Sequence, residues 1–167
     1  YPYTSLQDAI DDARTGDMII VEPGIYVTTE FFINGRGITI SSTDPSNPDV
    51  VAETVFDGFN QGDRAFIITG VDVVTLNGLT IRNTRHGSGG ILSGPNRPAG
   101  DDGWPGFSTF GSGIYLQDGN HIIANCVIQN CRVFGGNGQS GTNGLLHTDD
   151  HPADMPDGGN GGDGGSA

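Results

Sequence analysis

Short apolar segments separated by glycine, asparagine or aspartate recur along most of this chain. Each segment holds three or four residues, as in Met18–Val21, Gly24–Val27 and Phe31–Ile33. A strand this short cannot bury an apolar face alone, so such strands must stack on copies of themselves, as in solenoid proteins. The pattern therefore predicts a stack of short β-strands with loops at its corners. The other predicted strands are Ile38–Ile40, Thr54–Phe56, Ala65–Ile68, Val74–Leu76, Leu79–Ile81, Gly113–Leu116, His121–Ile123 and Cys126–Ile128.

Two pairs of segments align at the spacing of successive turns of such a stack. Ile40 aligns with Leu76 at a spacing of 36 residues, and 78–83 aligns with 125–130 at a spacing of 47. Uneven spacings are expected when loops of different length interrupt the corners. Asn83 and Asn130 then occupy matching corners, where amide side chains can bond the backbone and stack on one another.

The first seventeen residues are predicted to cap the stack with a short amphipathic helix. Ser5 is a suitable N-cap, and Gly16 ends the helical pattern. Terminal units of a solenoid need such a cap because one of their faces has no neighbouring unit. The apolar residues that fall on one helical face are Leu6, Ala9, Ile10 and Ala13.

We expect one domain over residues 1–167, with the cap in 1–17 and the stacked strands in 18–131. Two long glycine-rich loops are predicted: an insertion at 84–111, and a Gly/Asp-rich segment at 132–167 that leads into a further coil. Gly165–Ala167 resembles the approach to the strand at 113–116. The chain is therefore expected to be a fragment of a longer solenoid or a subunit that assembles through an exposed end.

The charge of the chain excludes some partners. Its formal net charge is -13, all seven basic residues are arginine, and seventeen of the twenty acids are aspartate. Such a surface repels nucleic acid and anionic lipid, and no apolar stretch is long enough to span a membrane. The excess of aspartate over glutamate has three possible explanations: aspartate favours turns, it can ligate Ca²⁺, and it is common on salt-adapted surfaces.

Several motifs resemble the N-terminal part of the pectate-lyase-like right-handed parallel β-helix superfamily. They are Leu6–Ile10, Gly16–Val21, Pro23–Tyr26, Gly37–Ser42 and Gly78–Asn83, and the resemblance covers about residues 1–131. It implies an all-β fold, a right-handed parallel β-helix. Because this superfamily holds lyases, hydrolases, tail spikes, adhesins and non-catalytic surface proteins, the resemblance does not decide the function.

Enzymes of this superfamily place either a Ca²⁺ carboxylate cluster with a basic residue, or two or three aspartates, on the sheet face. The predicted strands here present mostly Thr, Asn, Gln and Ser outward. The weak catalytic candidates are Arg82, Arg85 and His86. An arginine on a solvated strand is more often paired with a neighbouring acid.

Two regions outside the strands offer ligands. The first surrounds Trp104, with Asp101 and Asp102, where an aromatic ring can stack on a sugar, anchor a protein or pack its own loop. The second could hold Zn²⁺ or Ca²⁺, or be a solvated acidic loop. Its candidate ligands are His147, Asp149, Asp150, His151, Asp154, Asp157 and Asp163, the last within a glycine-rich calcium-like pattern. Ca²⁺ is the only cofactor expected.

Two functions follow as hypotheses. The first is an extracellular or cell-surface β-helical module that binds glycans, surface proteins or copies of itself. The alternative is a polysaccharide lyase or glycoside hydrolase that acts on an acidic polysaccharide, with Ca²⁺ bridging the like charges. An ice-binding face is less favoured, because Thr39, Thr75 and Thr80 are few and irregular. Whether Cys126 and Cys131 form a disulfide is left open.

Overall fold

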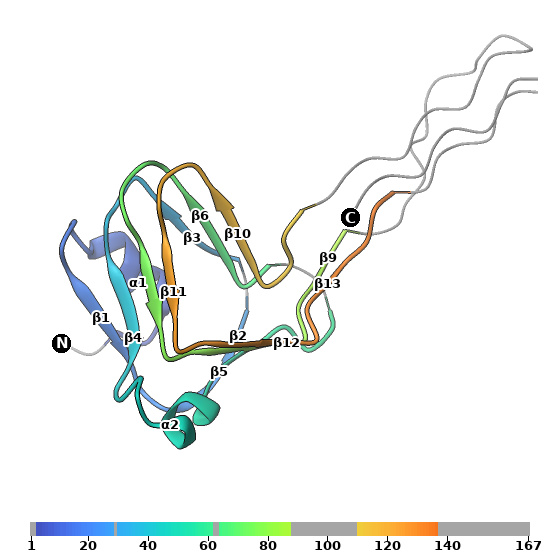
Figure 1. The fold of residues 1–167 in the computed structure, drawn as a ribbon, viewed down its shortest axis with the longest axis horizontal. Helices are drawn as coiled ribbons and strands as arrows, with labels where there is room; N and C mark the ends of the chain where they lie inside the picture. The colour runs from blue at the N-terminus through green and yellow to red at the C-terminus, as the bar shows by residue number, and fades with distance from the viewer. Residues whose placement is uncertain (1–2, 29, 62–63, 88–109, 137–167) are drawn as a thin grey trace, which may run out of the picture. The chain divides into compact units, whose positions relative to one another are not determined.

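The computed structural model describes residues 3–28, 30–61, 64–87 and 110–136 (Figure 1). Contacts divide the chain into two units, 1–86 with 111–132 and 87–110 with 133–167. The first contains both described helices and, Val133 excepted, every described strand residue. The second lies within the two segments predicted as glycine-rich loops. A single domain over 1–167 stays a prediction.

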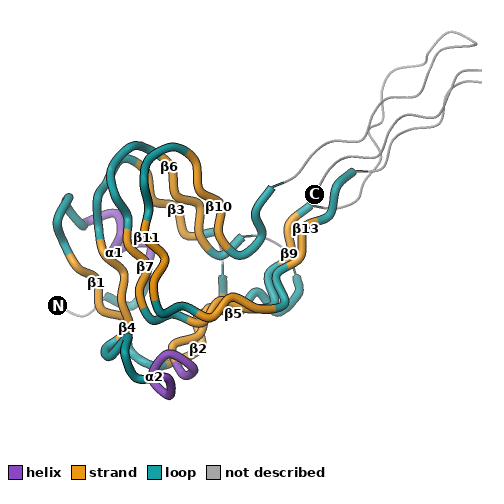
Figure 2. The backbone as a smooth tube through the Cα atoms, viewed as in Figure 1, coloured by secondary structure: helices purple, strands orange, loops and turns teal. Residues whose placement is uncertain are grey.

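Most of the regular secondary structure in the described chain is strand, arranged in parallel sheets, with few helices (Figure 2). The chain contributes one strand to each of three sheets in turn and then begins again. We call one such round through the three sheets a pass. The first sheet has the order β1 (Met18–Val21), β4 (Thr39–Ser42), β7 (Thr75–Asn77), β11 (Ile122–Ala124). The second has the order β2 (Gly24–Val27), β5 (Thr54–Asp57), β8 (Thr80–Arg82), β12 (Val127–Gln129). The third has the order β3 (Phe31–Asn34), β6 (Phe66–Thr69), β10 (Ile114–Gln117).

The register of the sheets confirms both alignments predicted from the sequence. Ile40 of β4 pairs with Leu76 of β7, and Ile81 of β8 pairs with Ile128 of β12, in parallel ladders. Figure 1 shows β1, β4 and β11 running in the same direction within their sheet. Equivalent residues of successive passes therefore lie beside one another.

Several strands begin one residue later than predicted. Ile38, Val74, Leu79 and Ala65 precede β4, β7, β8 and β6, yet each is at most 1% exposed. Side chains two residues apart in extended chain point to the same face, so Ile38 and Ile40 both reach the core. The apolar pattern marks the inward positions, and it includes the corner before the strand.

The core is a set of apolar ladders that run across the passes. Ile40 and Leu76 stand in one ladder, and Phe56 and Ile81 in another, all with 0% exposure. Phe56 lies at the centre of the aromatic contacts, 5.3 Å from the ring of Tyr26 and 5.1 Å from that of Phe66. Burial of these rings stabilises the first two passes, and aliphatic side chains such as Leu76 and Ile81 take their place in the third.

The predicted capping helix is present as α1 (Leu6–Asp12). The side chain of Ser5 accepts a hydrogen bond from the amide of Asp8 at 3.4 Å, as an N-cap does. Ala9 and Ile10 are buried, and α1 packs against β3. The helix ends before Gly16, because the chain is already extended at Ala13.

A second helix, α2 (Pro48–Glu53), was not expected from the sequence. Asn47 caps it by accepting a hydrogen bond from the amide of Asp49 at 3.0 Å, and Pro48 stands in its first turn. It lies over the outward face of the second sheet, where Thr80 Oγ1 donates to the carbonyl of Val51 at 2.7 Å. Neither α1 nor α2 has the length and apolar character needed to cross a membrane.

The first residues of the two predicted glycine-rich loops form strands instead of loop. Residues 84–111 and 132–167 were expected to be loop, but Arg85–His86 forms β9 and Arg132–Val133 forms β13. The two strands pair with each other, and the amide of Arg132 donates to the carbonyl of Thr84 at 2.9 Å. Pairing between passes therefore continues past the corner asparagines Asn83 and Asn130.

The aromatic core gives a direct test of the stack. Phe56→Ala is expected to lower the free energy of unfolding by about 3–5 kcal/mol, because it removes a fully buried ring and leaves a cavity. Phe32→Ala is the matched control: that ring is 46% exposed, and surface changes usually stay within about 0.5 kcal/mol. Urea unfolding followed by circular dichroism measures both. Equal losses in the two variants would contradict the packing described.

Candidate functional site

A buried carboxylate organises one corner of the stack. Asp57, the last residue of β5, is 2% exposed. Its Oδ2 accepts a hydrogen bond from Arg82 Nε at 2.7 Å, and its Oδ1 accepts one from the Phe59 amide at 2.8 Å. Asn83 Nδ2 donates to both carboxylate oxygens, at 3.0 and 3.2 Å. We call Asp57, Phe59, Arg82 and Asn83 the Asp57 cluster.

Electrostatics keep this carboxylate ionised. Burial acts to raise the pKa of Asp57, but the hydrogen bonds from Phe59, Arg82 and Asn83 and the charge of Arg82 outweigh it, so the pKa lies below its ordinary value. The side chain of Arg82 is 33% exposed and that of Asp57 only 3%. The partly exposed guanidinium of Arg82 therefore neutralises the buried carboxylate of Asp57.

The backbone of this corner adopts conformations that few residue types tolerate, and they bring the members of the cluster together. Phe59, Asn60 and Asn83 have φ of 49°, 58° and 55°, in the left-handed region that asparagine tolerates better than most residues. A Cβ on Gly58 would stand 2.7 Å from the carbonyl oxygen of Asn83, so only glycine lets the two passes approach this closely.

Amide side chains continue the corner into the next pass. Asn130 Nδ2 donates to Asn83 Oδ1 at 3.5 Å, and Asn130 shares the left-handed conformation with φ 55°. The predicted stacking of these two corner asparagines is confirmed. A second amide pair joins Asn125 to Asn77 at 2.9 Å.

A shallow cavity of about 420 Å³ lies beside the Asp57 cluster. Arg82 and Glu53 supply its charged groups, and its other lining residues are Pro23, Gly24, Ile25, Ala52 and Val55. One guanidinium and one carboxylate at an apolar surface can hold a polar ligand, but Arg82 is already engaged by Asp57. The arrangement fits a structural ion pair better than a reacting base.

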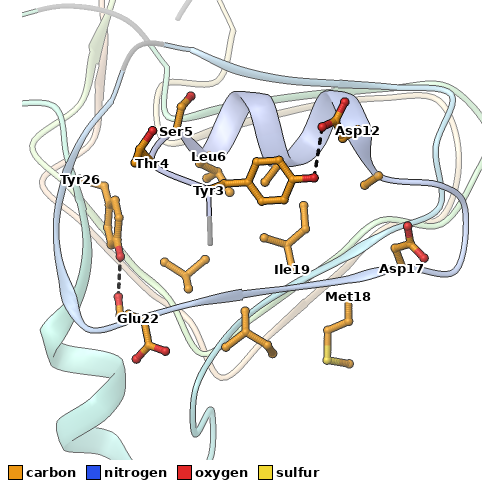
Figure 3. Close-up of a pocket in the computed structure, with 14 residues that line it drawn as sticks. Tyr3, Thr4, Ser5, Leu6, Asp12, Asp17, Met18, Ile19, Glu22 and Tyr26 are labelled. Carbon is orange, nitrogen blue, oxygen red and sulfur yellow. Dashed lines mark hydrogen bonds between the residues drawn. The ribbon is translucent and has the colours of Figure 1, made fainter. Parts of the chain in front are cut away.

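A second cavity, of about 480 Å³, lies between α1 and β1 (Figure 3). Figure 3 shows the hydroxyl of Tyr3 directed at Asp12 and that of Tyr26 at the main chain of Glu22; the bonds measure 3.1 and 2.7 Å. The bond to Asp12 raises the pKa of Tyr3, and burial raises the pKa of Tyr26. Both phenols therefore stay protonated at neutral pH.

The structure separates the predicted catalytic residues. Arg82 lies in β8 and pairs with Asp57, as an arginine on a solvated strand was expected to pair with an acid. Arg85 and His86 form β9, beyond Asn83; Arg85 is exposed and His86 half-buried. Arg82 therefore lies at the end of one strand, and Arg85 and His86 lie in the next strand along the chain.

The predicted ligand and metal residues lie outside the described part of the chain. This holds for Trp104, Asp101, Asp102, His147, Asp149, Asp150, His151, Asp154, Asp157 and Asp163. Within 3–28, 30–61, 64–87 and 110–136, no three His, Cys, Asp or Glu side chains converge as metal ligands would.

The cysteines are both free and half-buried. Cys126, which follows Leu79 by one pass in the aligned segments, packs against the core, and its Sγ lies 3.2 Å from the carbonyl oxygen of Ala124. Burial raises the pKa of the Cys126 thiol. It therefore acts as a small apolar side chain.

Comparison of the chain with protein-family models, with curated proteins and with solved structures finds no match.

Asp57 itself was missed from the sequence. The signal lies in Asp57-Gly58, an acid and a glycine at the end of an apolar segment, which is also the composition of an ordinary turn. Aligning the segment at 54–56 with that at 79–81 places Asp57 opposite Arg82. The opposite charges of Asp57 and Arg82 at aligned positions of successive passes could have identified this ion pair.

The Asp57 cluster predicts a measurable pH dependence. Asp57→Asn removes the charge and places an amide NH2 against a donor, either Arg82 Nε or the Phe59 amide, and we expect it to lower the free energy of unfolding at pH 7 by about 1.5–3 kcal/mol, the range for hydrogen bonds to charged groups. Because the folded pKa of Asp57 is depressed, its contribution is complete above the unfolded pKa of about 3.9 and is lost as the pH falls through the folded pKa. The difference between the two proteins should therefore shrink below about pH 4.

Urea unfolding at a series of pH values measures this effect. Glu22→Gln is the control, since Glu22 is exposed and the change removes the same charge. A difference between wild type and Asp57→Asn that stays constant down to the lowest pH would show that the carboxylate is not held as described.

Proposed function

We propose that this chain is a segment of a right-handed parallel β-helix, related to the pectate-lyase-like superfamily, that serves as a non-catalytic interaction module. The observed fixed order of three parallel sheets supports the β-helix, because a chain that winds repeatedly in one sense would produce that order. In-register apolar ladders support it as well.

The last described pass is the observation that carries the interaction role. Among the described residues, β10, β11 and β12 each have a strand neighbour on one side only. Leu116 and Ile128 are 45% and 49% exposed, although Ile68 and Ile81, their ladder partners in the preceding pass, are 0% exposed. An open set of strand edges with apolar side chains favours pairing with another β-layer.

A glycan is a second ligand class within this proposal. Phe32 and Tyr115 stand in one ladder of the third sheet, with Ile67 between them. Phe32 is 46% exposed while its neighbours Phe31 and Ile33 are buried, so its ring lies on the outward face. An exposed aromatic ring such as that of Phe32 can stack on a sugar ring, whereas the ring of Tyr115 already carries the guanidinium of Arg64, 4.9 Å from its centroid. Trp104 would extend this role, and an extracellular or cell-surface location would suit it.

The enzyme alternative has less support. A lyase needs an arginine or lysine free to take a proton, and Arg82 donates Nε to a buried carboxylate at 2.7 Å. A hydrolase needs paired acids, and Asp57 already accepts hydrogen bonds from three residues. The proposal keeps Ca²⁺ as an ion bound by the acidic residues beyond 136, with a structural and not a catalytic role.

A cleavage assay separates the two functions. The chain is incubated with a polyuronate, with Ca²⁺ or with a chelator, and both new reducing ends and unsaturated products are measured. We expect neither product above the level of a protein-free blank, because Arg82 and Asp57 are already engaged by each other. Ca²⁺-dependent cleavage that Arg82→Lys abolishes would overturn the proposal, since lysine keeps the charge but not the geometry of the guanidinium.

A further inference from the structure

The cavity of about 480 Å³ between α1 and β1 has the size and the apolar walls of a site for a small organic molecule. Leu6 and Ala9 line it from α1, and Ile19 and Val21 line it from β1. Such walls offer contact area to any apolar body of suitable size. The polar groups of the lining therefore decide which class of ligand fits.

Three carboxylates stand around this cavity and give it a negative charge. Asp12 is the last residue of α1, Asp17 precedes β1, and Glu22 follows β1. Figure 3 shows Asp12 and Asp17 toward one end of the cavity and Glu22 toward the other. The lining contains no Lys, Arg or His, and neither ion pair found in the described ranges includes any of these acids. Charge complementarity therefore favours a positively charged occupant.

The spacing of these acids suits an organic cation better than a metal ion. A bound Ca²⁺ ion gathers six to eight oxygens around one point. Across the residues that the structure places, no three acidic, His or Cys side chains converge in that way. An organic cation needs a carboxylate only near its charge, and the rest of its surface can pack on apolar walls.

The two tyrosines of the cavity can only accept hydrogen bonds from a ligand. The hydroxyl of Tyr3 donates to Asp12 at 3.1 Å, and that of Tyr26 donates to the carbonyl of Glu22 at 2.7 Å. Each oxygen therefore has only lone pairs left, which match the N–H donors of an ammonium group. The ring of Tyr3 adds a face that attracts a cation.

The negative field of the acids reaches both rings. The hydrogen bond to Asp12, and then the charge of Asp12, raise the pKa of Tyr3. Burial, and then the charge of Glu22, raise the pKa of Tyr26. A field that disfavours a phenolate at these positions favours a cation there.

We propose that the cavity between α1 and β1 binds a small organic ammonium ion. Its charged nitrogen lies at the end of the cavity that holds Asp12 and Asp17, beside the ring of Tyr3. Its apolar body lies between Leu6 and Ile19. This site goes beyond the proposed function, because β1 and the last described strand of its sheet, β11, stand at opposite ends of that sheet.

Phenethylamine is the probe, since it carries an ammonium group on a small apolar body. Its binding to the full chain is followed by the shifts of backbone amide signals in two-dimensional NMR spectra. We expect saturable shifts in α1 and β1, with a dissociation constant of about 1 mM or tighter. Phenethyl alcohol and hydrocinnamate have a similar shape but are neutral and anionic. Each should bind at least about fivefold more weakly, the effect of one close charge contact near water.

Asp12→Asn should weaken the binding of phenethylamine about fivefold, because it removes one close charge, and should leave that of phenethyl alcohol unchanged. Glu53→Gln is the matched control, since it removes the same charge at the cavity beside the Asp57 cluster; it should leave both affinities unchanged. Circular dichroism shows whether each variant is folded. Asp17→Asn, with the same expected loss, replaces Asp12→Asn if that variant does not fold.

Four results would each overturn this inference. They are the absence of saturable phenethylamine binding, equal affinity for the three probes, shifts that spare α1 and β1, and equal affinities of Asp12→Asn and Glu53→Gln for phenethylamine. The proposed function is tested separately by the cleavage assay, which does not depend on this cavity.

Discussion

Parallel pairing in constant register is the constraint on which the rest of this structure depends. It places Ile40 beside Leu76 and Phe56 beside Ile81, so that inward positions meet inward positions in each successive pass. A shift of one residue in a single strand would turn its apolar side chains outward and its polar ones into the core. The strands are too short to tolerate that loss, because each contributes at most two buried apolar side chains. The apolar side chains are therefore buried by their neighbours in adjacent passes, and no strand is stable alone.

The corners maintain this register. Asn83 and Asn130 adopt the same left-handed conformation at equivalent positions, and their amides are joined by a hydrogen bond. Asp57 stands at the same corner one pass earlier, where Asn83 and Arg82 bind it. The Asp57 cluster thus begins a polar ladder parallel to the apolar ones. Its position explains why the carboxylate is buried and charged: its hydrogen bonds hold two passes together.

The sequence was most informative where one residue type repeats at an inward or corner position. The alignments of Ile40 with Leu76 and of Asn83 with Asn130 needed only the repeated pattern, and so did the N-cap at Ser5. Contacts between unlike groups were not predictable in the same way. Gln7 bonds the main chain of Phe32, twenty-five residues away, and no local pattern marks a glutamine as a strand mimic. The helix α2 was missed although Asn47 and Pro48 mark its start, because it is short and interrupts the strand pattern.

The account is tested most directly by nuclear Overhauser effects between backbone protons of the first sheet. Parallel strands in the described register bring the main chain of Leu76 between those of Ile40 and Ile123. We predict inter-strand contacts from β7 to both β4 and β11, in the pattern of parallel pairing and at these residues. Contacts between β4 and β7 in an antiparallel pattern, or shifted by one residue, would contradict the account.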